Sequence, residues 1–199
     1  GKDMNHIISL LKTSNTRVVT TMIIDDVISK KLFDREGFLN ANSTKYLPER
    51  YIIEFKKGED KHLKLLSRYE NVAVYKKQLD EWILKRLYEN DIDLILGTDS
   101  GTFGLGIVPG YSVHEELRIL TENGLSPFEA LKTATVNAGK VIYEITGNND
   151  TGTVAEGKRA DLILLKDNPL EDIEALEKIE GVMINGTWLS RDELKALLK

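Results

Sequence analysis

The stretch "LILGTDSGTFGLGIVPG", residues 94–110, decides how the rest of the chain is interpreted. It opens with apolar residues typical of a buried strand and then turns into Gly97-Thr98-Asp99 and a glycine-rich loop. Loops at strand ends often carry binding and catalytic side chains, because the strand holds them rigidly while the loop leaves them accessible. Asp99 is therefore the first candidate functional residue.

Three kinds of site place an aspartate in such a loop. An aspartic-protease half-site has a similar Asp-Ser-Gly-Thr sequence, but those enzymes need two such loops on an all-β scaffold, whereas helical patterns flank Asp99 on both sides. A phosphate-binding loop would use the glycines from Gly97 to Gly106, yet the Gly-Lys-Ser/Thr ending and the dinucleotide spacing are both missing. A carboxylate near a metal at the C-terminal end of a barrel strand fits the order strand, loop, helix.

The composition limits the class of protein. With 199 residues and 41% hydrophobic content, the chain can bury a sizeable core. A net charge of -5 without a basic stripe argues against a nucleic-acid partner. We expect no membrane span and a cytoplasmic protein, because no apolar run approaches about 20 residues and the first residues lack a signal-peptide pattern. The absence of cysteine excludes disulfides, thiolate metal sites and cysteine nucleophiles.

Apolar periodicity predicts the elements of the first half. The β-branched run "RVVTTMII", residues 17–24, is typical of a buried parallel strand. The turn-rich segment "REGFLNANSTKYLPER", residues 35–50, indicates a loop insertion with a short helix after Pro48. Helices are expected over residues 4–12 and, as one long or two consecutive helices, over residues 61–89.

Start and stop signals divide the second half of the chain. The first helix after the glycine-rich loop is expected to run from about Ser112 to Glu122, with Gly124 ending it. A capping box with proline at the first helical position, Ser126–Glu129, begins another helix that runs to about Ile142. Both boundaries, the helix end at Gly124 and the helix start at Ser126, are thus predicted from residues at the boundary itself.

The character of the chain changes after Gly147 to a smaller, β-rich element. Short strands are expected near residues 161–165 and 181–184, with Asp161 as a structural residue at the start of an edge strand. Asn185-Gly186 is a hairpin signal, and Ser190 with Glu193 caps a last helix.

Four blocks in this second half resemble the C-terminal part of an amidohydrolase-superfamily enzyme, of the imidazolonepropionase and Xaa-Pro dipeptidase-like type. They occur in the same order and at matching distances, which makes the resemblance more specific than the aspartate alone. The blocks are "DIDLILGTDSG" (91–101), "VPGYSVHEELRILTENGLSPFEALKTATVNAGKVI" (108–142), "GTVAEGKRADLILLKDNPLEDI" (152–173) and "VMINGTW" (182–188).

Each block corresponds to a family feature. In that family the eighth barrel strand ends in Gly-Thr-Asp, here at Asp99, and the following helix carries a Glu-Leu pair, here Glu116-Leu117. The next helix has an Ala-Leu-x-x-Ala-Thr pattern, here Ala130–Thr135. The block from Glu156 to Leu162 then returns the chain to a small β-sandwich.

The resemblance implies an α/β fold, namely a C-terminal fragment of a metal-dependent (β/α)8 barrel plus part of a small β-sandwich domain. Residues 1–147 would form the last βα units, with an insertion near residues 25–90 and with residues 17–24 as strand seven. Residues 148–199 would form the C-terminal part of the small β domain with its terminal helix.

The resemblance also implies a chemistry. Asp99 would contact a divalent metal, Zn²⁺ or Mn²⁺, and accept a proton from the attacking water. The reaction would be hydrolysis of a C–N bond in a small cyclic amide, amide or dipeptide-like substrate. Asp99 is thus both the catalytic and the metal-contacting candidate.

The remaining metal ligands of that family are missing. It uses a His-x-His pair on the first strand, a lysine or acid on the fourth, and histidines on the fifth and sixth, whereas only His6, His62 and His114 occur here and none has ligand spacing. His114 is expected to be a solvated or hydrogen-bonded helix residue. A full barrel takes about 250 residues, so we expect the chain to be the C-terminal portion of such an enzyme, inactive alone, with the missing N-terminal part as a partner.

Two expectations concern assembly. Two parallel strands alone would leave both sheet edges open, so we expect another chain to cover them and the protein to be a homo-oligomer, most simply a dimer. The alternative from a different class is a non-catalytic packing or oligomerisation module, or one half of a pseudoenzyme.

Overall fold

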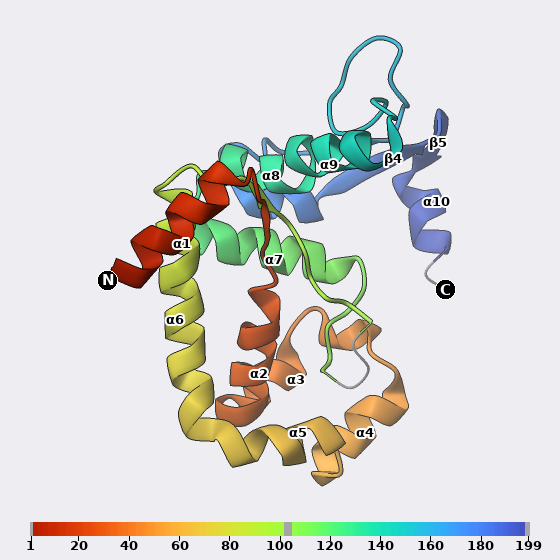
Figure 1. Cartoon of the computed structure of the whole chain (residues 1–199). Coiled ribbons are helices and arrows are strands. Elements are labelled where there is room, and N and C mark those ends of the chain that lie inside the picture. The colour runs from red at the N-terminus through yellow and green to blue at the C-terminus, as the bar shows by residue number, and fades with distance from the viewer. Residues whose placement is uncertain (1, 102–104, 198–199) are drawn as a thin grey trace.

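The computed structural model describes residues 2–101 and 105–197, an α/β fold in which helices predominate (Figure 1). The middle of the glycine-rich loop lies outside these residues. The helices of the first half are α1 (Lys2–Thr13), α2 (Ile23–Phe33), α3 (Arg35–Asn40), α4 (Glu49–Lys57), α5 (Lys61–Leu66) and α6 (Glu70–Tyr88), with 3₁₀ turns η1 (Thr44–Tyr46) and η2 (Ser67–Tyr69). The second half contains α7 (Tyr111–Glu122), α8 (Pro127–Ala134), α9 (Val136–Thr146), the 3₁₀ turn η3 (Ile173–Glu177) and α10 (Arg191–Ala196).

The strands form two separate sheets. β1 (Val18–Val19) and β2 (Leu94–Ile95) make a parallel pair in which Val18 lies opposite Leu94. β3 (Leu162–Leu165), β4 (Ile179–Ile184) and β5 (Thr187–Ser190) make an antiparallel sheet in that order. In Figure 1 this second sheet lies beside α9 and α10, at the opposite end of the molecule from α4 and α5.

The expectation of a strand over residues 17–24 is wrong beyond Val19. Helix α2 already begins at Ile23. Its first N–H groups are bonded by the side chain of Glu116 on α7, a partner far away in the sequence. A short β-branched run is ambiguous between strand and buried helix, and here a tertiary contact decides for a helix.

The loop expected over residues 35–50 contains a helix. Asp34 precedes α3, and its side chain accepts the N–H of Gly37 at 2.9 Å, which caps the helix. The short helix after Pro48 is confirmed as α4. The helical pattern over residues 61–89 is confirmed as two consecutive helices, α5 and α6, joined by η2.

The helix expected to run from Ser126 to about Ile142 is two helices. The Ser126 side chain accepts the N–H of Glu129 at 3.2 Å, as a cap should, although the Glu129 carboxylate pairs with Lys132 instead of returning to the cap. Thr135, with φ -123° and ψ -85°, separates α8 from α9. The chain therefore turns one residue after Ala134, and α9 continues to Thr146.

This break covers the outer edge of β2. The carbonyl of Thr133 accepts the N–H of Leu96 at 3.2 Å, and the Asn137 side chain donates to the carbonyl of Leu94 at 2.8 Å. Because an unbroken helix would use the Thr133 carbonyl internally, the break at Thr135 makes it available to the strand. The expectation that both edges of the parallel pair are open is thus wrong for the β2 edge.

The small sheet follows its local sequence signals. Asn185 and Gly186 have φ of 48° and 78° between the paired residues Ile184 and Thr187, the positive angles that a type I′ hairpin requires. Asp161 has the expected structural role, since its carboxylate accepts the N–H of Asn185 at 2.6 Å. The capping box at Ser190 and Glu193 is confirmed at the start of α10.

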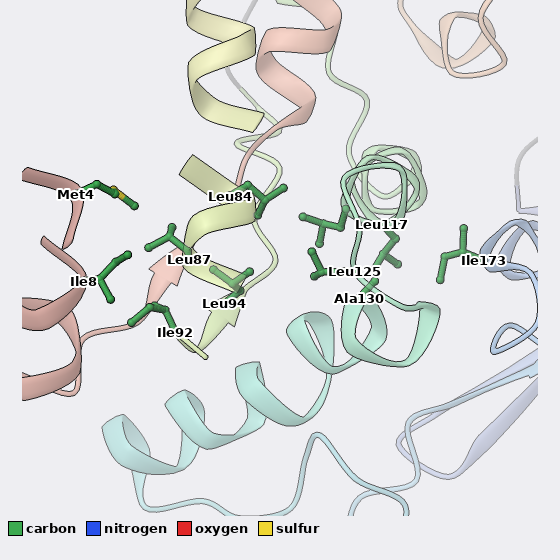
Figure 2. Packing of buried hydrophobic residues seen from close by; sticks show 11 residues of the cluster. Met4, Ile8, Leu84, Leu87, Ile92, Leu94, Leu117, Leu125, Ala130 and Ile173 are labelled. Carbon is green, nitrogen blue, oxygen red and sulfur yellow. The ribbon is translucent and has the colours of Figure 1, made fainter. Parts of the chain in front are cut away.

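The larger apolar cluster joins both halves of the chain (Figure 2). Met4 and Ile8 on α1 lie near Leu84 and Leu87 on α6, and Leu94 of β2 lies close by. Helices α7 and α8 and the loop between them close the cluster from the other side with Leu117, Leu120, Leu125 and Ala130. Each large apolar side chain stabilises the fold by about 1.5–3 kcal/mol when buried, so this cluster fixes β2 against four helices. Among the described residues, no helix is long and apolar enough to cross a membrane.

Candidate functional site

The candidate site lies where the two parallel strands end. β1 and β2 are joined by hydrogen bonds from Val18 N–H to the Asp93 carbonyl (3.1 Å) and from Thr20 N–H to the Ile95 carbonyl (2.9 Å). Because the strands are parallel, the residues after Val19 and the residues after Ile95 leave the sheet at the same end. Thr21 therefore lies near the segment that contains Asp99.

Asp99 is exposed and lies four residues beyond β2. Its φ is 50°, in the left-handed region that aspartate tolerates better than most residues. The carboxylate is therefore presented from a sharp turn at the carboxyl end of a parallel strand. This is the location expected from the sequence, and its catalytic and metal-contacting roles remain predictions.

Gly97 allows the two strand ends to approach each other. A Cβ on this residue would lie 2.5 Å from Cγ1 of Val19 and 3.1 Å from Cγ2 of Thr21. Any side chain here would force the ends of β1 and β2 apart. The glycine before Thr98-Asp99 is thus required by packing against the neighbouring strand.

Glu116 is the residue of this region whose role the sequence did not reveal. Its side chain is fully buried, and its carboxylate accepts N–H groups from Thr21 (3.0 Å), Met22 (3.0 Å) and Ile23 (2.7 Å). Burial raises the pKa of Glu116, while hydrogen bonds from Thr20, Ile23 and Met22 oppose this rise. A signal was present, because Glu116 occupies a position between Val113 and Leu120 on the apolar face of α7.

A cleft of about 200 Å³ is lined by β1 and the residues that follow it, 18–22, and also by Leu94 of β2. The apolar side chains of Ile83, Leu84 and Leu87 on α6 contribute to its lining, and so do the charged side chains of Asp25, Lys76 and Asp80. The Lys76 ammonium lies 2.9 Å from the Asp25 carboxylate and also contacts Asp80. Burial, and then the nearby Asp80 carboxyl, raise the pKa of Asp25 to about 6.

The histidines are far from one another in the fold. His6 is on α1, His62 on α5 and His114 on α7. His114 is half-buried in a separate cleft of about 250 Å³ that Tyr111 and Glu177 also line, and burial lowers its pKa. Within residues 2–101 and 105–197, no three His, Asp or Glu side chains are arranged to hold a metal ion. One carboxylate, Asp99, is fewer than the about three protein ligands that a catalytic zinc takes, so these residues alone do not fit a catalytic metal centre.

Known structures and sequences resemble the chain over different spans. Ochratoxinase from Aspergillus niger is 36% identical over 92 residues, which are 46% of this chain and 17% of that protein. A solved Xaa-Pro dipeptidase with bound methionine superimposes with a TM-score of 0.62 at 22% identity, covering 92% of this chain and 36% of that one. The solved A. niger ochratoxinase gives a TM-score of 0.50 at 26% identity, covering 71% of this chain and 31% of that one.

These values show how much of each relative's length the chain covers. The chain spans roughly a third of the solved relatives, 36% and 31% of their lengths, and the sequence match covers a sixth of ochratoxinase. The model of the amidohydrolase family matches residues 73–189, more than half of the 199 residues, and this range includes β2, Asp99, Glu116 and all but the last residue of the small sheet. The resemblance seen in the four sequence blocks is confirmed: the chain belongs to the amidohydrolase family.

Proposed function

We propose that the complete protein containing this chain is a hydrolase that cleaves a C–N bond in a cyclic amide, amide or dipeptide-like substrate. Membership of the amidohydrolase family supports hydrolysis. The likeness to a Xaa-Pro dipeptidase supports a small dipeptide-like substrate. In this proposal β1 and β2 are strands seven and eight of a (β/α)8 barrel. The sheet β3–β5 is part of a small β-sandwich that begins after residue 147.

The observation that carries the proposal is the position of Asp99. Asp99 is exposed and lies four residues beyond β2, at the end of the parallel pair where β1 also ends. The carboxyl ends of parallel barrel strands are where such folds place their chemistry. A carboxylate there can accept a proton from a water molecule as the water oxygen bonds to the substrate carbon. It can then return the proton to the nitrogen as the C–N bond breaks.

A divalent metal, Zn²⁺ or Mn²⁺, belongs to this proposal only for the complete protein. Such an ion would lower the pKa of a bound water. Because the described residues lack a ligand cluster, most of its ligands would come from elsewhere in the protein, with Asp99 as one contributor. The proton-transfer role proposed for Asp99 rests on its own carboxylate and position.

The test is Asp99→Asn in the complete protein, assayed with Xaa-Pro dipeptides, N-acyl amino acids and cyclic amides in the presence of Zn²⁺ or Mn²⁺. Asparagine keeps the shape and the tolerance for a positive φ but cannot accept the proton. We expect kcat to fall by about 10²–10⁴-fold, the usual effect of losing a general acid–base group, with a smaller change in KM.

Asp91→Asn is the matched control. Asp91 is also exposed, also has a positive φ, 55° against 50° for Asp99, and lies at the opposite end of the same strand. We expect this variant to keep its activity within about twofold, because it preserves side-chain size and is remote from the proposed chemistry. If kcat of Asp99→Asn falls by less than about tenfold, ~1.4 kcal/mol, the result favours the non-catalytic module instead.

A further inference from the structure

We propose that Glu116 is a positioning residue for the candidate site, acting on Asp99 through the backbone of Thr21 and the close contact between Thr21 and Gly97. This inference deepens the proposed function and rests on it. It concerns a residue on α7 that is fully buried and cannot meet a substrate itself. The role follows from three links, each visible in the structure.

The first link is the hydrogen bonding of Glu116. One carboxylate oxygen accepts the N–H groups of Thr21 and Met22, and the other accepts that of Ile23 at 2.7 Å. Helix α2 has no side-chain cap of its own, because Met22 stands at the N-cap. A serine or aspartate at that position would cap the helix locally without burying a charge. Glu116 does more than a local cap, since its bonds extend back beyond the helix to Thr21.

The second link is the conformation of Thr21. Its φ is 117°, a value that a β-branched residue adopts only under constraint. The Glu116 bond to its N–H and the acceptance of the Ile24 N–H by its carbonyl (3.2 Å) hold the residue in this geometry. Strain of this kind persists where the surrounding structure over-determines it and is concentrated at functional sites.

The third link joins Thr21 to Asp99. Cγ2 of Thr21 and Cγ1 of Val19 lie so close to Gly97 that a Cβ there would be 3.1 Å and 2.5 Å from them. Gly97 is two residues before Asp99, whose own φ of 50° sets the direction of the carboxylate. Displacement of Thr21 therefore moves the packing surface against which this turn is formed. A carboxylate misplaced by about 1 Å can cost about 10²-fold in rate.

Thr21→Gly separates positioning from stability. Glycine adopts a φ of 117° without strain, so this variant should fold with an unchanged or higher Tm. It also removes the methyl group that contacts Gly97. If Thr21 positions the turn, kcat of the complete protein falls at least tenfold with little change in KM although stability is retained. A purely structural Thr21 would leave kcat within twofold, and that result overturns the inference.

Glu116→Gln tests the first link, with Glu115→Gln as the matched control on the neighbouring residue. Glutamine keeps one acceptor oxygen but turns an NH₂ group toward one of the backbone N–H donors. In the complete protein, hydrogen–deuterium exchange should become faster in peptides covering residues 18–24 and 94–101. It should stay unchanged there in Glu115→Gln, because Glu115 bonds Ser43 instead. Faster exchange confined to residues 18–24 would overturn the inference.

The exchange readout distinguishes this inference from the proposed function. Coupled exchange of both peptides together with a fully active Asp99→Asn variant would remove the catalytic role of Asp99 and leave the mechanical coupling intact. An inactive Asp99→Asn variant with fully active Thr21→Gly and Glu116→Gln variants would leave the proposed function intact and remove the positioning role.

Discussion

Lys31 on α2 shows how this protein accommodates a fully buried charge. Its ammonium lies 2.7 Å from the Asp60 carboxylate and donates to the Tyr51 hydroxyl at 2.8 Å, and both ion-pair side chains are almost completely buried. The rings of Phe38 and Phe55 lie 5.8 and 5.6 Å from the nitrogen, within cation–π range. Burial lowers the pKa of Lys31, whereas the pairing with Asp60 raises it. The charge is tolerated only because its partners surround it.

Replacing Lys31 by methionine should therefore destabilise the protein strongly. The variant leaves the Asp60 carboxylate buried without its cation, which costs about 3–5 kcal/mol, and the double variant Lys31→Met/Asp60→Leu should recover most of that loss. Lys30→Met is the control, because Lys30 makes a partly exposed pair with Asp26, worth about 0–1 kcal/mol. Urea unfolding measures all three. Equal losses for Lys30→Met and Lys31→Met would show that the buried pair is unimportant.

Asp25 gives stability a defined pH dependence. Burial raises its pKa from 3.8 to about 6, so between these values the folded protein binds a proton that the unfolded chain has released. Stability from this group is present below pH 4 and is lost as the pH rises through about 6. Lys76 opposes the shift in the pKa of Asp25, and the raised pKa of Glu116 adds a slope of the same sign.

We expect Asp25→Asn to flatten the plot of unfolding free energy against pH between about 4 and 6. The variant removes proton uptake of up to about one proton on folding in this window, while the introduced amide oxygen can still accept a hydrogen bond from Lys76. Asp26→Asn is the comparison: burial raises the pKa of Asp26, but its ion pairs with Lys30 and Lys77 outweigh this and lower it, so its slope has the opposite sign and lies mainly below about pH 4. A slope identical to that of the unmodified protein in Asp25→Asn would contradict this assignment.

At the scale of elements, the junction between α8 and α9 supplies the hydrogen bonds that a second neighbouring strand would give to β2. Thr133 and Asn137, on either side of the break at Thr135, bond the N–H of Leu96 and the carbonyl of Leu94. A two-residue strand has little cohesion of its own. Its position therefore depends on β1 on one edge and on this helical junction on the other.

Asn137→Ala should cost about 1–3 kcal/mol, because the buried Leu94 carbonyl loses a hydrogen-bond donor. Asn123→Ala is the matched control: the Asn123 side chain also donates to a backbone carbonyl, that of Ile119, but this carbonyl already accepts the Asn123 N–H. We expect a loss below about 1 kcal/mol for the control. Urea unfolding measures the free energy of unfolding of both variants. Similar losses of unfolding free energy in the two would mean that the junction does not support β2.

Sequence reasoning succeeded where the determining contact is local. The hairpin at Asn185-Gly186, the cap at Ser190 and the helix after Pro48 depend on residues within a few positions of one another. It failed at Ile23 and Thr135, where Glu116 and Leu96 decide the outcome from elsewhere in the chain. Periodicity contains no information about such partners, so it extends the predicted strand to Ile24, past the start of α2 at Ile23, and treats α8 and α9 as one helix.

The residues of the candidate site also fall into those that the sequence predicts and those that depend on distant contacts. Asp99 could be located from the order of four sequence blocks and from the strand that precedes it. The strained angle of Thr21 could not be predicted, because a threonine in a β-branched run is ordinarily extended. The buried Glu116 was part of a recognised pattern, but its partners became apparent only from the packing of α7 against the end of β1.

At the scale of the whole molecule, the small sheet exposes apolar side chains on both faces. Ile163 on β3 is 57% exposed and Trp188 on β5 is 43% exposed, and Leu164 and Ile184 are similarly accessible. About half of each of these side chains stays exposed in the described part of the chain. Contiguous exposed apolar surface on a sheet favours association. This surface, in place of the bonded β2 edge, now supports the expectation of self-association.

We predict that the 199-residue chain forms a dimer or larger assembly at about 10 µM and that Ile163→Glu shifts it toward the monomer, because a charge on the sheet face opposes apolar contact. Leu65→Glu is the control, since Leu65 is equally exposed, 53%, but lies on α5 at the far end of the molecule. Light scattering gives the masses. A monomeric mass for the unmodified chain would refute the prediction.

The Glu116 contact also has a consequence for the time at which α2 can form. Glu116 lies 95 residues after Thr21 and 93 after Ile23. A ribosome that adds about 5–20 residues per second needs roughly 5–20 s to reach it after α2 has been made. During this interval the first turn of α2 has no cap, and its apolar residues Ile23 and Val27 lack the later partner Ile119. A nascent chain stalled before residue 116 should therefore expose this helix to proteases and chaperones, whereas one stalled after the emergence of α7 should protect it.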